Sequence, residues 1–420
     1  MKYTLEVIIE PEKHYIHVEG ATKNVNCKHL EQIFLNENYN IKSLKSQTGE
    51  LDFVFDKTGD RPPFDTISRP VIINSDIDDL YFEYDGVITE VMSGVNQINE
   101  DLVELACYSG WYPKIFDLSF KFAFEINLKI SKGYFVTTNG SISLTESGSI
   151  TNQYILKSTC NVMDIVIFAS PKVSHTKKAT KGLEVNIYCA DKAKDIAQLK
   201  MDKIVAGYEI LTKLFGDNQL NQQIMNYIYR PFGGWAYARE GLVIMPEQDI
   251  IERTLSKYDL ANYVHIDLHE LAHNWWNIAS TTKYDWINEG LAEFSSLTLI
   301  KEMFGDEVFA SYVESYAAKI EDEEEAISIL DTKSNSPDRE LNHYIKTALM
   351  YIGAEKRYGK QALFGFLKKY FQHFSGTDYA DTDSFLIMCE TEIGKDAREY
   401  FQHLLTSKGW EHLAVKKDLI

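Results

Sequence analysis

The stretch from His265 to Gly290 reads HIDLHELAHNWWNIASTTKYDWINEG, and the rest of the chain can be understood around it. Its centre is the pentapeptide His-Glu-Leu-Ala-His, in which His269 and His273 are four residues apart. Residues at that spacing are neighbours on one face of a helix. Two neutral imidazoles placed in this way can share one zinc ion at bond lengths of about 2 Å. The stretch therefore predicts a helix that carries two ligands of a zinc site.

The residues around this pair indicate how the site is completed. Glu270 follows the first histidine directly, where a carboxylate can act as general base toward the water that zinc activates. A catalytic zinc keeps three protein ligands and one open position, so a third ligand has to come from another segment. Glu289, within the segment Trp286–Gly290 (WINEG), can close a His, His, Glu site from a second helix. The pentapeptide alone also arises by chance, and this downstream segment is what favours a site.

The combination of HELAHNWWN and WINEG resembles the gluzincin zinc aminopeptidases, the family of membrane alanyl aminopeptidases and leukotriene hydrolase. In that family the pattern reads HELAHQWFGN and then WLNEG. The resemblance implies that His269, His273 and Glu289 hold one zinc ion per chain and that Glu270 is the catalytic base. It also implies a role for Tyr344, whose segment Tyr-Ile-Lys-Thr-Ala is similar to the family's Tyr-x-Lys-Gly-Ala. Its hydroxyl is expected to donate a hydrogen bond to the developing oxyanion.

The spacing of the third ligand departs from the family pattern. Fifteen residues separate His273 from Glu289, where the family usually has eighteen. We interpret this as a shortened loop within Asn277–Asp285. Glu293 is the competing ligand, but the WINEG context favours Glu289. Because Glu293 lies one helical turn later, it is expected to orient a ligand from behind.

A third histidine, His265, lies four residues before His269 on the same predicted helical face. At a rise of 1.5 Å per residue it is about 12 Å from His273 along the helix axis. One zinc ion cannot bind both ends of that row. We therefore expect His265 to pack or to form hydrogen bonds rather than to bind metal.

The segment Pro231–Pro246 (PFGGWAYAREGLVIMP) is predicted to lie beside the substrate, because the family holds a Gly-x-Met-Glu-Asn segment at this position. Gly233 and Gly234 allow close approach of the backbone, and an edge strand there can pair with a peptide. Ala238 aligns with the family's glutamate that binds the substrate α-amine, so this specificity element is missing or displaced. Glu240 is the nearby carboxylate that could substitute, and the alternative is an exposed loop charge.

Composition limits the class of protein. The chain has 420 residues, 45% of them hydrophobic and 25% charged, as in globular proteins with a substantial core. A formal net charge of −19 argues against nucleic-acid and anionic-membrane partners. No apolar stretch is long enough to span a bilayer, and the N-terminal segment lacks a signal-peptide core. The five scattered cysteines indicate reduced thiols and a cytoplasmic location.

Hydrophobic periodicity predicts two parts with different secondary structure. Alternation in Tyr3–Ile9 and Phe122–Ile130 indicates strands with one buried face, and Asn139-Gly140 predicts a hairpin turn. The polar segment His175–Lys181 (HTKKATK) is expected to link two domains, and helical spacing begins near Asp191. We predict an α+β, multidomain protein. Residues 1–181 form an antiparallel β-domain, a saddle or sandwich, and residues 182–420 form a thermolysin-like, mainly α-helical catalytic domain.

The predicted function is zinc-dependent hydrolysis of peptide bonds, from the N-terminus of a peptide substrate. The resemblance also indicates a short family member, without the C-terminal helical domain that covers the active site in many relatives, and hence a more open cleft. One alternative is an endopeptidase or other hydrolase on the same zinc site. Another is a non-catalytic peptide-binding protein with a retained metal site. The preferred substrate and the oligomeric state are not indicated by the sequence.

Overall fold

The structure is a computed structural model that describes residues 1–408 apart from 63–64, 66, 90–94, 116–119, 181, 219–223, 232, 248–255, 322–326 and 376–378. The chain forms two compact units, each with its own interior. Unit 1 consists of Met1–Lys194 and Leu220–Glu247, and unit 2 consists of Asp195–Gln219 and Gln248–Ile420. Each unit thus contains two segments of the chain, and the proposed domain boundary after residue 181 stays a prediction.

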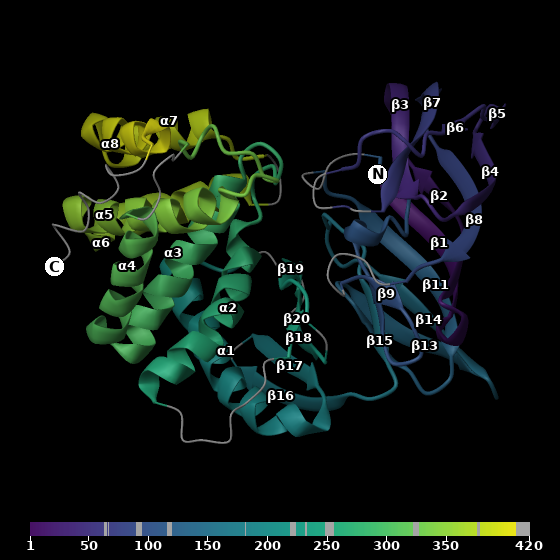
Figure 1. The fold of residues 1–420 in the computed structure, drawn as a ribbon, viewed down its shortest axis with the longest axis horizontal. Coiled ribbons are helices and arrows are strands. Elements are labelled where there is room, and N and C mark those ends of the chain that lie inside the picture. The colour runs from purple at the N-terminus through teal and green to yellow at the C-terminus, as the bar shows by residue number, and fades with distance from the viewer. Residues whose placement is uncertain are drawn as a thin grey trace. The chain divides into compact units, whose positions relative to one another are not determined.

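Unit 1 contains an eight-stranded sheet, which includes β1 (Lys2–Glu10) and β11 (Ala123–Ser131) (Figure 1). Both strands have the predicted alternation of buried and more exposed residues. Every second residue of the first strand is buried, from Tyr3 to Ile9. This strand pairs in parallel with the strand that follows Phe122, with Leu5 opposite Ile126, and the other pairs of the sheet are antiparallel. The strand order is β13 (Ser141–Ser147), β14 (Thr151–Lys157), β11 (Ala123–Ser131), β1 (Lys2–Glu10), β2 (Tyr15–Lys23), β8 (Leu80–Val87), β4 (Asn40–Ser46) and β5 (Gly49–Glu50).

Two smaller sheets accompany it in unit 1. A buried apolar cluster contains residues of all three sheets, among them Leu5, Ile33 and Ile167. The four-stranded sheet has the order β12 (Phe135–Thr138), β15 (Ile167–Ser170), β10 (Val103–Leu105) and β9 (Gln97–Ile98). The three-stranded sheet has the order β3 (Cys27–Asn36), β7 (Ser68–Ile77) and β6 (Val54–Phe55).

The predicted hairpin at Asn139-Gly140 is wrong. The strands before and after it, β12 and β13, pair with β15 and β14 and belong to different sheets. A type I′ hairpin turn needs positive φ at both central residues, and neither residue has it. Asn139 is instead buried, with its amide donating to the carbonyl of Asp164 and accepting from the N–H of Val166. The dipeptide is a corner between two sheets.

A five-stranded sheet completes unit 1, and its edge corrects a second prediction. The order is β16 (Ser174–Thr180), β17 (Leu183–Cys189), β18 (Ile224–Arg230), β20 (Leu242–Pro246) and β19 (Tyr237–Arg239). The supposed interdomain linker His175–Lys181 falls largely on β16, which pairs along its length with β17. Its polar, lysine-rich sequence reflects an exposed edge strand, where charged side chains discourage further pairing. The opposite edge is β19, which contains Ala238.

Unit 2 is helical, as predicted. Its longest helix, α1 (Lys194–Phe215), ends at Gly216, whose positive φ and N–H bond to the carbonyl of Thr212 stop it. The remaining helices are α2 (Lys257–Trp276), α3 (Asp285–Phe304), α4 (Asp306–Glu321), the π-helical η4 (Glu340–Lys346), α5 (Thr347–Tyr358), α6 (Lys360–Phe374), α7 (Thr382–Glu392) and α8 (Lys395–Thr406). The α+β class, with a β-rich part before a helical part, is therefore confirmed.

Helices α2 and α3 pack side by side in the interior of unit 2. Ser256 and Asp259 form a capping box at the start of α2. Near its end, the indole of Trp276 donates to the hydroxyl of Ser295 on α3 at 2.8 Å. Gly207 of α1 lies close to α2, because a Cβ atom added to it would be 3.0 Å from a side-chain methyl group of Leu268. The two helices that carry the predicted ligands are therefore fixed by the core of the unit.

Two further observations concern composition. The described cysteines, which are all five, are free thiols. Among the helices that the structure describes, none is both long and apolar enough to cross a bilayer.

Candidate active site

Helix α2 presents His269 and His273 on one face, as their spacing predicts. Their rings lie 4.9 Å apart, centre to centre, and the two residues are only 6% and 9% exposed. Glu270, the predicted base, lies on the same helix and is 6% exposed. Because the backbone of a packed helix sets these positions, no separate loop has to be ordered to bring them together.

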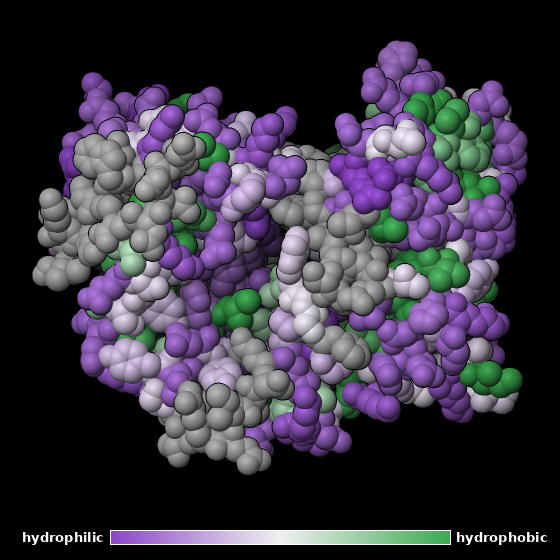
Figure 2. All heavy atoms as spheres, viewed as in Figure 1, coloured by the Kyte–Doolittle hydropathy of each residue, from purple (hydrophilic) through white to green (hydrophobic). Residues whose placement is uncertain are grey.

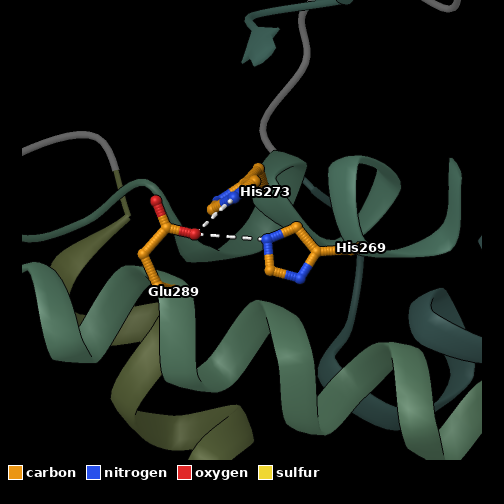
Figure 3. A group of neighbouring side chains, drawn as sticks. All are labelled: His269, His273 and Glu289. Atoms are coloured by element: carbon orange, nitrogen blue, oxygen red, sulfur yellow. Dashed lines mark hydrogen bonds and ion pairs between the residues drawn. The ribbon is translucent and has the colours of Figure 1, made fainter. Parts of the chain in front are cut away.

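Glu289 on α3 lies opposite the two histidines (Figure 3). Its Oε2 atom is 3.2 Å from Nε2 of His269 and 3.3 Å from Nε2 of His273. The candidate ligand atoms of the three residues all lie within 4.8 Å of one another. Among the described residues, this is the one group of three or more His, Cys, Asp or Glu side chains with such geometry.

Glu293 lies behind the histidines rather than among the candidate ligands. Its Oε2 is 2.7 Å from Nδ1 of His269, while its Oε1 is 2.9 Å from Nε2 of His265 and accepts from the hydroxyl of Tyr316. A hydrogen bond from Nδ1–H of His269 to this carboxylate orients the ring so that Nε2 is the nitrogen on the side of Glu289. His265 also contacts Ser296, at 3.2 Å, so it forms hydrogen bonds as expected.

The short connection between α2 and α3 is closed by the side chain of Asn288. Its Oδ1 accepts from the N–H groups of Ile278 and Ala279 at 3.1 and 3.0 Å. Its amide donates back to the carbonyl of Ala279 at 2.9 Å. This clasp ties the end of α2 to the residue next to Glu289.

Tyr344 and Arg339 approach the site from η4 and the residue before it. The Tyr344 ring stacks on His269 with centroids 5.3 Å apart and planes 13° from parallel. Arg339 donates to Glu289 Oε1 at 2.7 Å, to Asp285 Oδ2 at 2.6 Å and to the hydroxyl of Tyr344 at 2.9 Å. Sequence reasoning selected Tyr344 but missed Arg339, because no motif distinguishes this arginine from the other arginines.

Burial and neighbouring charges shift the pKa values of the site. Burial lowers the pKa of His269, but Glu289 and Glu293 outweigh it and raise this pKa to about 10. Burial acts to raise the pKa of Glu289, yet Arg339 and His273 hold it well below its ordinary value. Burial raises the pKa of Tyr344 well above its ordinary value, and the charge of Glu289 adds to this. At neutral pH the carboxylates of Glu289 and Glu293 are ionised and the Tyr344 phenol keeps its proton.

This donor set fits a zinc ion. Two imidazoles and one carboxylate are a ligand set of catalytic zinc sites with three protein ligands. The ionised carboxylates stabilise positive charge between them, which is what the raised pKa of His269 records. Glu293 supplies the carboxylate partner that metal-ligating histidines commonly have.

Comparison with known proteins gives the fold a name. A zinc metallopeptidase of the M1 class from Deinococcus radiodurans superposes with a TM-score of 0.72 at 14% identity, over 97% of this chain and 93% of that chain. A Glu-to-Ala mutant from the same organism, bound to a Tyr-Ser-Ala substrate, gives 0.72 at 15% identity over 97% and 94%. A two-domain M1 zinc metallopeptidase mutant bound to L-arginine gives 0.72 at 14% identity over 97% and 94%.

The chain has the M1 zinc metallopeptidase fold. The predicted gluzincin resemblance is therefore confirmed at the level of the fold. No family model matches the sequence, and no curated protein matches it. The two motifs HELAH and WINEG are present in this sequence.

The segment that the sequence predicts to lie beside the substrate, Pro231–Pro246, belongs to unit 1. Gly233 and Gly234 are in the connection from β18 to β19, and the carbonyl of Gly233 accepts from Nε of Arg230 at 3.4 Å. Glu240 is in the tight turn between β19 and β20. Its Oε1 accepts from the backbone N–H of Met163 at 3.2 Å and lies 4.0 Å from Nζ of Lys121. The substrate-binding roles of these residues stay predictions.

Proposed function

We propose that this protein is a zinc-dependent peptidase that hydrolyses N-terminal peptide bonds, with His269, His273 and Glu289 holding one zinc ion per chain. The observation that carries the proposal is the position of Glu289 Oε2, within 3.3 Å of both Nε2 atoms. The M1 fold supports it, and so does the Tyr-Ser-Ala substrate that is bound to one of the similar Deinococcus structures.

The mechanism assigns one task to each of two further residues. A zinc ion held there supplies Lewis acidity toward a peptide carbonyl and lowers the pKa of water to about 7. Glu270 takes up a proton from the attacking water and passes it to the leaving amine. The Tyr344 hydroxyl, which keeps its proton at neutral pH, donates a hydrogen bond to the carbonyl oxygen as negative charge develops.

Replacing the base tests this assignment. Glu270→Gln should bind zinc as tightly as wild type and lose at least about 100-fold in kcat, because a base is removed without touching a ligand. Zinc content by mass spectrometry and turnover of a peptide library are measured on both proteins. A zinc-loaded wild type that cleaves nothing in the library would instead favour the alternative of a non-catalytic peptide-binding protein.

Selectivity for the peptide end tests the aminopeptidase part. Ala238 stands where the resembling family has an amine-binding glutamate, and Glu240 contacts Met163 and Lys121. A hydrogen bond to a charged amine contributes about 1.5–3 kcal/mol, or roughly ten- to 150-fold in affinity. We therefore expect matched free and N-acetylated peptides to differ by less than about tenfold in kcat/KM.

The control for this comparison is Glu240→Ala. If wild type discriminates by more than about 100-fold and the variant does not, Glu240 is the amine ligand and our interpretation of the segment is wrong. Equal hydrolysis of free and acetylated peptides at internal bonds would favour the endopeptidase alternative.

A cytoplasmic location is part of the proposal, supported by the five free cysteines.

A further inference from the structure

Arg339 connects several groups of the candidate site through a single guanidinium group. Its Nη2 donates to Glu289 Oε1 at 2.7 Å, and its Nη1 donates to the hydroxyl of Tyr344 at 2.9 Å. Its Cζ also lies 5.1 Å from the centre of the Tyr344 ring, which in turn stacks on His269. Nε donates to Asp285, a residue only 2% exposed at the start of α3. One side chain thus contacts both the candidate metal ligand and the candidate oxyanion donor.

We infer that Arg339 is a positioning residue that orients Glu289 as a ligand through one oxygen and Tyr344 as a hydrogen-bond donor. This inference rests on the proposed function. It concerns how two groups are held for that chemistry, and Arg339 itself is not assigned a contact with the reacting atoms.

The orientation of Glu289 follows from the division of its two oxygens. Oε1 accepts from Arg339, and Oε2 faces Nε2 of His269 and Nε2 of His273. A guanidinium has a planar, rigid set of donors, so a carboxylate bonded to it has little freedom to rotate. Arg339 therefore fixes which oxygen is presented to the two imidazoles.

The orientation of Tyr344 follows from the chemistry of its partner. A guanidinium can donate hydrogen bonds but cannot accept them. The bond from Arg339 therefore occupies a lone pair of the Tyr344 oxygen and leaves the hydroxyl hydrogen for an acceptor, a place that the Glu289 carboxylate takes in this structure. This is the arrangement that a hydrogen-bond donor to a carbonyl oxygen requires.

A lysine cannot replace this arginine. Glu289, Asp285 and Tyr344 each accept a hydrogen bond from a different nitrogen of the guanidinium. An ammonium group is a compact point charge that does not present donors in a planar fork. Charge alone would therefore preserve the ion pairs only in part and would lose the fixed geometry.

The test compares Arg339→Gln and Arg339→Lys with Arg357→Gln. Arg357 is a matched control because it also pairs with a carboxylate, Asp396 at 3.0 Å, and lies 5.5 Å from the ring of Tyr358. We measure zinc affinity by chelator competition, kcat and KM on one peptide, and Tm. Both Arg339 variants should bind zinc about ten- to 100-fold more weakly and lose kcat more than they raise KM. Arg357→Gln should leave both the zinc affinity and kcat unchanged.

Two double variants make the result specific. In a Tyr344→Phe background, Arg339→Gln should cost less in kcat than it does alone, because part of its effect passes through the hydroxyl. Arg339→Gln removes the guanidinium from the buried Asp285 and keeps its 3.5 Å contact with Nδ1 of His343. The Asp285→Asn/Arg339→Gln protein removes this buried charge as well, so it separates loss of folding from loss of positioning. It should regain Tm but not zinc affinity.

The inference is overturned by wild-type zinc affinity and kcat in Arg339→Gln, or by full recovery of both in Arg339→Lys. If the losses in kcat caused by Arg339→Gln and by Tyr344→Phe are additive in the double variant, the inferred orientation of Tyr344 by Arg339 is also overturned. These outcomes differ from the result expected if the proposed function is wrong. If it is wrong, the wild-type protein itself would take up no zinc or would cleave no peptide.

Discussion

Glu289 and Glu293 are one helical turn apart on α3, yet they face different atoms of His269. Glu289 Oε2 lies 3.2 Å from Nε2, on the side shared with His273, and Glu293 Oε2 lies 2.7 Å from Nδ1. In the proposed assignment, Glu289 is a metal ligand and Glu293 is the group that orients a ligand. Removing a ligand is expected to weaken metal binding more than removing its partner does.

The corresponding prediction orders three variants on one helix. Glu293→Ala should weaken zinc binding by about ten- to 100-fold, and Glu289→Ala should weaken it further. Glu302→Ala is the control, since Glu302 pairs with Lys360 at 2.6 Å and is 42% exposed. Zinc affinities by chelator competition check the order. A stronger effect of Glu293→Ala than of Glu289→Ala would mean that the ligand assignment is reversed.

At the scale of residues, the sequence predicts the candidate metal ligands but not the residues that hold them in place. His269, His273 and Glu289 follow from helical spacing and WINEG, and the structure places them together. Arg339 could not be predicted, because its role depends on η4 meeting α3, a long-range contact that no local pattern encodes. The same holds for Tyr316, whose bond to Glu293 joins α4 to α3.

At the scale of elements, α3 and the start of α5 approach each other closely at Gly290. A Cβ added to Gly290 would lie 2.0 Å from Cγ2 and 2.7 Å from Cβ of Thr347, and 3.2 Å from the carbonyl oxygen of His343. No rearrangement of a flexible side-chain end relieves such a contact, so the two elements have to separate. This close approach gives the last residue of WINEG a packing role.

Gly290→Ala is therefore expected to lower the free energy of unfolding by about 1–3 kcal/mol, the usual cost of overpacking a core. Gly365→Ala is the matched control within unit 2. It lies on α6 with nothing within 4 Å of an added Cβ, so it should stabilise the protein by about 0.5–1 kcal/mol. Urea or thermal unfolding of both variants measures the difference. A neutral Gly290→Ala would show that the helices are less tightly packed than this distance implies.

Elements with strong periodicity were predictable, and their connections were not. The strand β1 and the helix α1 follow from alternation and from helical spacing of apolar residues. Asn139-Gly140 failed as a hairpin because the buried asparagine bonds to Asp164 and Val166, partners supplied by tertiary structure. The His175–Lys181 segment failed as a linker because an exposed edge strand is as polar as a loop.

At the scale of the whole molecule, composition predicted the polar character of the surface. The face shown in Figure 2 is mainly hydrophilic, with hydrophobic groups scattered over it, as a net charge of −19 leads one to expect. Unit 1 includes Leu220–Glu247, and unit 2 includes Asp195–Gln219, so each unit contains two segments of the chain. Such an exchange of segments is set by strand pairing between β17 and β18, which local sequence does not show.

The three candidate ligands lie on packed helices, and this has a consequence for how the protein would acquire the proposed activity. The buried core around α2 and α3 and the Asn288 clasp hold the ligands through contacts made by the protein alone. Newly made chains should therefore fold first and load metal afterwards, unlike small zinc domains in which the two events coincide. A chelator should abolish hydrolysis while leaving the far-ultraviolet circular dichroism unchanged, and added zinc should restore turnover without refolding. Metal supply would then set the active fraction of a constant pool of folded protein.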